Sequence, residues 1–162
     1  MRIGVLSDTH LHEPTEAFAA FFERFLAPAD VLVHCGDIAG PSMLAFLESH
    51  VALYAVSGNM DVQLGELPPV RNVALGGNRR LGVVHGHNLP GRDIPRAVAT
   101  YFGDGPRLIC FGHTHERYWE ALSDGRFLLN PGSVTRPRDG RPGAALVDWP
   151  EDGPPEVQWV ES

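Results

Sequence analysis

Short runs of apolar and β-branched residues recur along the chain, and each run leads into glycine, aspartate, asparagine or histidine. Five of them predict buried strands, at residues 2–8, 31–37, 51–59, 79–87 and 107–113. Amphipathic patterns between the first three runs predict helices over residues 15–27 and 41–49, the second with Pro41 suited to a first turn. This alternation of strand and helix predicts right-handed βαβ units in a parallel sheet.

The pattern changes in the second half of the chain. A third helix is predicted over residues 94–103, with Asp93 as its cap and Gly103 as its stop. Further on, residues 116–130 predict two strands around an Asp124-Gly125 hairpin turn. Two more strands are predicted at residues 144–149 and 156–160, joined by a proline-rich turn. We therefore expect this half to be mostly antiparallel β-structure, and, since no repeat or linker interrupts the chain, a single domain over residues 1–162.

Composition agrees with a globular protein. The chain has 162 residues, of which 43% are hydrophobic, and this is enough for one domain with a core. No apolar run reaches the roughly 20 residues that span a bilayer, and the N-terminus enters a strand pattern without a signal-peptide core. We expect a soluble, cytoplasmic protein. Cys35 and Cys110 each lie inside an apolar run, which favours reduced core thiols over a disulfide.

The net charge and the absence of lysine argue against several classes of function. The formal net charge of −7 argues against a nonspecific binder of long nucleic acid, which needs a basic face. All 13 basic residues are arginine, so a P-loop lysine and a Schiff-base lysine are excluded.

Polar side chains follow five of the predicted strands. They are Asp8 and His10, Asp37, Asn59, His85 and His87, and His113 and His115. In an open α/β sheet the carboxyl ends of the strands form the crevice where ligands bind. An aspartate or asparagine there is by itself most often a turn former, and we interpret His34 and His50 as structural, in a strand and at a helix C-terminus.

Taken together, these side chains favour a cation. Carboxylate, amide oxygen and imidazole without thiolate suit Mn²⁺, Fe, Zn²⁺ or Ni²⁺ better than Ca²⁺. With one histidine of the His85/His87 pair counted, these strands supply seven ligands, too many for one small ion, whereas two ions roughly 3.5–4 Å apart that share one carboxylate would use them all. A tyrosine-phosphatase loop starting at Cys35 is excluded, because Pro41 stands where its arginine is needed and Asp37 would repel phosphate.

At these residues the chain resembles the calcineurin-like metallophosphoesterase superfamily, and in its size the small prokaryotic phosphodiesterase branch. The matching motifs, in order, are Asp8-x-His10, Gly36-Asp37, Gly58-Asn59, His85-Gly86 and Gly112-His113-x-His115. Residues 130–138 are also typical of that branch. The resemblance implies an α/β fold, a four-layer α/β/β/α sandwich of two mixed β-sheets flanked by helices.

The resemblance also implies a ligand set for two divalent ions, with Mn²⁺ expected first and Fe, Ni²⁺ or Zn²⁺ as alternatives. One ion would take Asp8, His10, Asp37 and His115. The other would take Asp37, Asn59, His85 and His113, so that Asp37 bridges the two. We favour His85 over His87 as the ligand and expect His87 to contact the substrate, which makes Asp37, Asn59 and His87 the candidate catalytic residues.

The implied activity is hydrolysis of a small or nucleotide-like phosphate ester, most of all a diester, by in-line attack of a metal-bridging hydroxide. The superfamily often has a histidine directly after the asparagine of its third motif, but this chain has Met60 and then Asp61. Methionine cannot donate a proton, so we expect slow turnover of alkoxide leaving groups and faster turnover of aryl esters. His12 and His87 are candidate replacement acids.

Other residues and functions stay open at this stage. Arg136 and Arg138 either clamp a substrate phosphate or are solvated loop charges. Residues 130–133 are interpreted as a turn, since Ser133 lacks a nucleophile elbow. A noncatalytic scaffold or protein-interaction module of the same fold, as in retromer, is the alternative function, and a nuclease is disfavoured by the acidic charge. The expected partner is a small phosphate-ester substrate, with no membrane, and homo-oligomer formation is left open.

Overall fold

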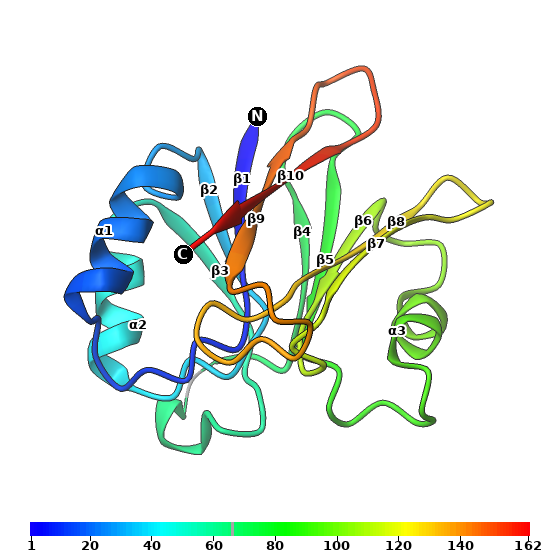
Figure 1. Ribbon diagram of the computed structural model, residues 1–162. Helices are drawn as coiled ribbons and strands as arrows, with labels where there is room; N and C mark the ends of the chain where they lie inside the picture. The colour runs from blue at the N-terminus through cyan, green and yellow to red at the C-terminus, as the bar shows by residue number, and fades with distance from the viewer. Residues whose placement is uncertain (66) are drawn as a thin grey trace.

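Two five-stranded β-sheets pack face to face, with helices on their outer faces (Figure 1). The computed structural model of the protein describes residues 1–65 and 67–162. The first sheet has the order β10-β9-β1-β2-β3. Its strands are β1 (Arg2–Leu6), β2 (Val31–His34), β3 (Ala52–Ala55), β9 (Gly143–Asp148) and β10 (Glu156–Glu161). β1, β2 and β3 are parallel, as predicted, and β9 pairs antiparallel with β1 and β10.

The second sheet has the order β4-β5-β6-β8-β7. Its strands are β4 (Val70–Ala74), β5 (Arg80–Val84), β6 (Leu108–Phe111), β7 (Arg117–Ala121) and β8 (Phe127–Pro131). The predicted hairpin of β7 and β8 is confirmed, but β8 also pairs parallel with β6, so the antiparallel expectation holds only in part. Strand β4 was not predicted from the sequence.

In the described part of the chain three α-helices cover the sheets: α1 (Glu16–Phe25), α2 (Pro41–Glu48) and α3 (Ile94–Phe102). Figure 1 shows α1 and α2 on the outer face of the first sheet and α3 on the outer face of the second. The hydroxyl of Thr15 accepts from the N–H of Phe18 and so caps α1, and Asp93 caps α3 in the predicted way. A short 3₁₀ helix, η1 (Val62–Leu64), follows β3. The four-layer α/β/β/α sandwich is therefore confirmed.

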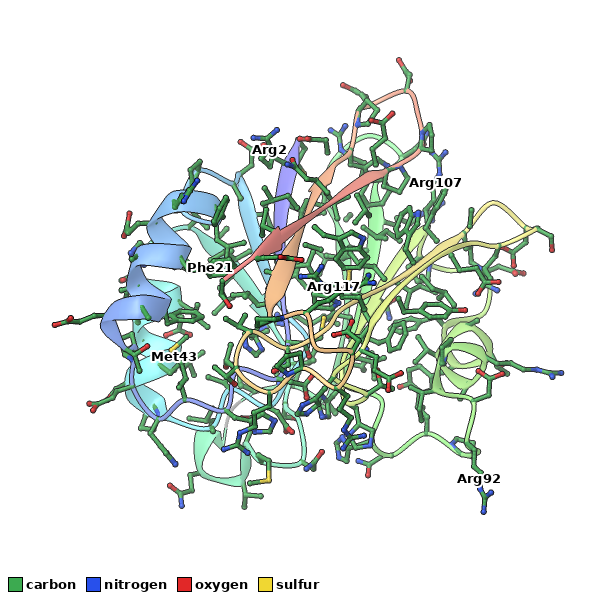
Figure 2. The ribbon with its side chains drawn as sticks, viewed as in Figure 1. Arg2, Phe21, Met43, Arg92, Arg107 and Arg117 are labelled. Carbon is green, nitrogen blue, oxygen red and sulfur yellow. The ribbon has the colours of Figure 1, made fainter. Side chains whose placement is uncertain are left out.

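The core lies in three layers, which follow from the alternation of side chains along the strands. Ile3 and Val5 of β1 pack between the two sheets, whereas Leu6 and Leu32 pack under α1 and α2. Figure 2 shows Phe21 and Met43 in this second layer. A smaller cluster lies between α3 and the second sheet. Both cysteines are buried and free, as expected. Among the described residues, no helix combines the length and the apolar character needed to cross a membrane.

Candidate metal centre

The loops that follow β1, β2, β5 and β6 meet at the lower end of the sandwich in Figure 1. Hydrogen bonds join them within and between the sheets. The N–H groups of Asp8 and His10 donate to the carbonyls of Gly36 and Asp37, each over 3.0 Å. Across the sheets, the N–H of His113 donates to Oδ2 of Asp8 over 3.0 Å. The packing of two sheets thus fixes side chains from distant parts of the sequence against one another.

The seven predicted ligand residues lie together in this place. Two overlapping groups have their donor atoms within 4.8 Å of one another, Asp8 with His10 and His115, and Asp8 with Asp37 and His85. The Oδ1 atom of Asn59 lies 3.2 Å from Nε2 of His85. The ring of His113 packs 5.2 Å from the ring of His85, centroid to centroid. The structure therefore brings the predicted set into one cluster, while the role of each residue as a ligand stays a prediction.

Asp37 occupies the middle of the cluster. Its Oδ2 atom lies 3.6 Å from Nε2 of His10 and 3.5 Å from Nε2 of His85. Its other oxygen, Oδ1, accepts from the N–H of Met60 over 2.8 Å, which fixes the orientation of the carboxylate. The position of Oδ2 between two histidines from opposite sheets suits a carboxylate shared by two cations, and Oδ1 of Asp8 lies 4.0 Å and 3.9 Å from the same two nitrogens.

The backbone at the cluster adopts a conformation that side chains usually avoid. Six residues other than glycine among those described have a positive φ. Five of them are predicted ligands: Asp8 (φ 51°), His10 (48°), Asp37 (57°), His113 (69°) and His115 (59°). Such strain costs on the order of 1 kcal/mol or more per residue and persists where the surrounding structure enforces it, most often at functional sites. The concentration of left-handed residues here indicates that the loops are shaped to aim these side chains.

Backbone carbonyls fix the tautomers of two histidines. Nδ1 of His85 donates to the carbonyl of Cys35, and Nδ1 of His115 donates to the carbonyl of Arg136, each over 2.8 Å. When each ring is neutral, Nε2 carries a lone pair that faces the carboxylates. This arrangement is the one found around histidines that bind metals. Burial opposes protonation of His85, but Asp37 and Asp8 outweigh it and raise its pKa, and Asp8 raises the pKa of His115.

Two further observations test whether the cluster fits a cation. Nε2 of His10 and Nε2 of His115 lie 3.2 Å apart. Nitrogen donors about 2.0–2.1 Å from one ion lie about 2.9–3.4 Å apart in octahedral or tetrahedral coordination, so this spacing suits a shared cation. Oδ1 of Asp8 is fully buried and has no hydrogen-bond donor among the described residues. A buried carboxylate oxygen without a donor is costly, and a cation would satisfy it.

The chain matches a known family over nearly its whole length. Residues 1–152 match the family model described as a calcineurin-like phosphoesterase superfamily domain. The chain belongs to this superfamily. A probable metallophosphoesterase of Methanothermobacter thermautotrophicus is 34% identical over 148 residues, which cover 91% of this chain and 85% of the relative. The resemblance inferred from the sequence motifs is confirmed.

Two solved structures share the superfamily fold. Vps29 of Entamoeba histolytica complexed with zinc has a TM-score of 0.79 at 22% identity, with 99% of each chain covered. An archaeal phosphodiesterase has a TM-score of 0.71 at 22% identity and covers 99% of this chain and 100% of that one. At these identities the comparison shows the likeness of fold alone.

Burial and neighbouring groups shift the pKa values of the ionisable side chains in the cluster. Burial opposes the ionisation of Asp37, but the His85 ring, the N–H of Met60 and His10 outweigh it and lower its pKa to about 2. The pKa of Asp8 is lowered as well, because His115, His85 and Ser7 together outweigh its burial. Burial lowers the pKa values of His10 and His113, which favours the neutral imidazole that a metal requires.

His87 lies at the edge of the cluster. Its ring centroid is 5.3 Å from that of His85 and 6.2 Å from that of His113. Burial and the nearby His85 lower its pKa, and its Nδ1 atom is buried with no hydrogen-bond partner in the described part of the chain. A lowered pKa leaves less of the His87 ring protonated near neutral pH and so less able to supply a proton, and we favour its predicted contact with substrate.

Four further candidates remain: two arginines, a histidine and a serine. Arg136 and Arg138 are exposed, and their loop is held by backbone hydrogen bonds to His115, which leaves the phosphate clamp a prediction. The ring of His12 is exposed. Ser133 is buried and donates to the carbonyl of Asp8, so it supports the loop, in agreement with a structural role. Asn130 and Pro131 form the end of β8, where a turn was predicted.

His34 has the structural role that was expected of it. The N–H of Gly36 donates to its Nδ1 over 3.2 Å, so Nε2 carries the proton and donates to Thr9 over 3.2 Å. Complete burial lowers its pKa to about 4, and the ring is neutral at physiological pH. His34 therefore links the loop after β1 to the loop after β2 through its contacts with Thr9 and Gly36.

Asp61 is a residue whose importance sequence reasoning missed. It is buried, and its carboxylate accepts from three backbone N–H groups: those of Asp37 (2.8 Å), Ala39 (2.9 Å) and Gly58 (2.8 Å). Asp61 thus ties the loop after β2 to the loop after β3. Its position two residues after Asn59 is compatible with an ordinary turn residue, and nothing in the sequence indicates these distant partners.

Replacing Asp61 with asparagine should destabilise the protein. The amide keeps one acceptor oxygen but turns an N–H₂ group toward a backbone donor, which leaves at least one buried N–H without a partner. We expect a loss of about 1–3 kcal/mol in the free energy of unfolding. Denaturant unfolding of the metal-free protein measures it, with Asp152→Asn in the exposed turn before β10 as the matched control. Equal stability of the two variants would contradict the role of Asp61 in holding the two loops together.

Proposed function

We propose that the chain is a dinuclear metal-dependent phosphodiesterase that acts on a small or nucleotide-like phosphate ester. The observation that carries the proposal is the position of Asp37 Oδ2, nearly equidistant from Nε2 of His10 and of His85. A carboxylate in this position can be shared by two cations, one on each side. The archaeal phosphodiesterase of the same fold supports the choice of reaction.

The chain's own groups would hold the cations in two sets. Asp8, His10, Asp37 and His115 form one set, and Asp37, Asn59, His85 and His113 form the other. When bound, two divalent cations supply a water of lowered pKa for in-line attack on phosphorus and neutralise the charge of the ester. The carbonyls of Cys35 and Arg136 keep the Nε2 lone pairs of His85 and His115 turned inward.

Charge balance favours an anionic substrate at this place. Two divalent cations bring four positive charges, and ionised Asp8 and Asp37 return two negative ones, which leaves a local surplus of two. The protein as a whole carries a formal charge of −7, so attraction of a phosphate ester depends on the loaded centre. His87, at the edge of the cluster, is placed to contact a nonbridging or ester oxygen.

The experiment that tests this function compares metal-free and metal-loaded protein. We expect metal analysis of protein reconstituted with Mn²⁺ to give two ions per chain, and hydrolysis of bis(p-nitrophenyl) phosphate to exceed that of p-nitrophenyl phosphate. Chelation should abolish both activities, and readdition of Mn²⁺ should restore them. Hydrolysis that survives complete removal of metal, or a loaded protein with no esterase activity, would refute the proposal.

The identity of residue 60 leads to a leaving-group prediction. Met60 stands where a proton-donating histidine is common in the superfamily, and its side chain is exposed and aprotic. General acid catalysis contributes roughly 10²–10⁴-fold to rate, and alkoxides depend on it far more than aryl oxides do. We therefore expect the ratio of aryl to alkyl diester turnover to fall in Met60→His, measured with bis(p-nitrophenyl) and dimethyl phosphate. An unchanged ratio would show that another group supplies the proton.

A noncatalytic protein-interaction module is the second candidate function. The likeness of fold to Vps29 favours it. The presence of all seven predicted ligand residues in one cluster favours the enzyme, because an interaction surface has no need of left-handed backbone at five of them. A protein that binds no metal and cleaves no ester after purification with excess metal would favour the interaction module.

A further inference from the structure

A small cavity lies directly beside the candidate metal centre. It measures about 170 Å³ and is bordered by His85 and His87 on the side of the centre. It is lined also by Val84 at the end of β5, Pro69 before β4, Asn88 and Leu89 in the loop after β5, and Tyr101 in the last turn of α3. The cavity is therefore built by the second sheet and its helix.

The lining of this cavity is mainly apolar. None of the described residues that line it is an aspartate, a glutamate or an arginine. The arrangement suits an uncharged group better than a second phosphate or an ammonium ion. The buried Nδ1 atom of His87, which has no partner among the described residues, adds one polar contact at the boundary with the metal centre.

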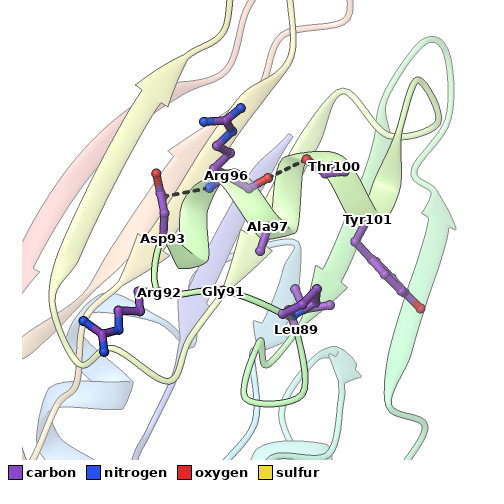
Figure 3. Close-up of a pocket in the computed structure, with 9 residues that line it drawn as sticks. Leu89, Gly91, Arg92, Asp93, Arg96, Ala97, Thr100 and Tyr101 are labelled. Carbon is purple, nitrogen blue, oxygen red and sulfur yellow. Dashed lines mark hydrogen bonds between the residues drawn. The ribbon is translucent and has the colours of Figure 1, made fainter.

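Tyr101 and Leu89 form the outer wall. The Tyr101 side chain is 53% exposed although it is one of the largest in the chain, and its ring packs edge-on against Phe102 at 5.3 Å. The same two residues also line a second, larger groove of about 380 Å³ along α3 (Figure 3). Figure 3 shows the side chains of Arg92 and Arg96 directed away from Leu89. Leu89 and Tyr101 therefore border both spaces, the small cavity beside the cluster and the larger groove along α3.

We propose that Pro69, Leu89 and Tyr101 form a subsite for one flat, uncharged ring of the phosphate ester, so that the enzyme selects esters of aromatic or heterocyclic alcohols. This inference rests on the proposed function. A cavity of about 150 Å³ holds a benzene ring, so a volume of about 170 Å³ admits one six-membered ring. The larger groove beyond Leu89 leaves room for a substituent on that ring.

The test uses two inert phosphonates that differ only in the ring. Benzylphosphonate and ethylphosphonate carry the same charge, and the ring of the first stands one atom from phosphorus, as in a phenyl ester. Isothermal titration of Mn²⁺-loaded wild-type protein should give a dissociation constant about tenfold or more lower for benzylphosphonate, because the ring buries apolar area that the methyl group lacks. This readout does not depend on turnover.

Substitutions of the lining residues test whether the ring binds in this cavity. Tyr101→Ala and Leu89→Ala should narrow the difference between the two probes to within about threefold and leave the affinity for ethylphosphonate unchanged, while Tyr101→Phe should keep the wild-type ratio. Equal affinities for the probes in the wild type, or a ratio retained in both alanine variants, would overturn the subsite. Failure of both phosphonates to bind loaded protein would instead contradict the proposed function, and the subsite with it.

Discussion

Asp37→Asn is expected to lower kcat/KM for bis(p-nitrophenyl) phosphate by at least about 10³-fold, because it removes the carboxylate oxygen that we propose both cations share. The asparagine oxygen can still accept from the N–H of Met60, as Oδ1 of Asp37 does over 2.8 Å. The amide N–H₂ group then points toward Nε2 of His10 and of His85, where Oδ2 lies in the native chain. An amide nitrogen does not bind a cation there, so metal content should fall from two ions to one or fewer.

Metal analysis and steady-state kinetics on the same preparation measure both effects. Asp152→Asn, which removes one carboxylate from an exposed turn, is the control for net charge and should match the wild type. Because Asp37 is 2% exposed, far-UV circular dichroism must show that the variant is folded. Wild-type metal content and rate in a folded Asp37→Asn protein would show that the bridge lies elsewhere, with Asp8 Oδ1 as the other carboxylate oxygen near both groups.

The parts of this site that were predictable are those in which the residue type itself carries the chemistry. Each aspartate or asparagine at the end of an apolar run is by itself most often a turn former, but their recurrence with histidine at the ends of five runs predicted that these side chains gather in one place. The parallel pairing of β1, β2 and β3 followed in the same way from the alternation of strand and helix. Both predictions depend on local pattern alone.

The supporting contacts were not predictable, since they use groups that every residue has. The carbonyls of Cys35 and Arg136 orient two histidines, but a carbonyl leaves no trace in the sequence. Asp61 accepts from backbone up to 24 residues away, and only the tertiary fold creates that contact. Strand β4 was missed for a different reason: it is a half-exposed edge strand in which Arg71 and Asn72 interrupt the apolar pattern.

The glycine before Asn59 gives the second large effect. A Cβ atom on Gly58 would lie 2.2 Å from Oδ1 and 2.4 Å from the backbone nitrogen of Asp37. Contacts this short do not occur, and since the backbone nitrogen belongs to a loop braced by Asp61, no flexible side chain can move to relieve them. Gly58 is therefore required to let the loop after β3 approach the loop after β2.

Gly58→Ala should cost about 2–4 kcal/mol in the free energy of unfolding, the range of a strong steric clash in a packed interior. It should also weaken metal binding, because the displaced atoms belong to the predicted bridging residue. Gly105→Ala is the matched control, since its added methyl group would lie 3.5 Å from the nearest atom outside its own neighbours. Denaturant unfolding and Mn²⁺ titration measure the two losses separately. A Gly58→Ala protein with the stability and metal affinity of Gly105→Ala would mean that the two loops are further apart than the cluster requires, and the shared-carboxylate centre would lose its geometric basis.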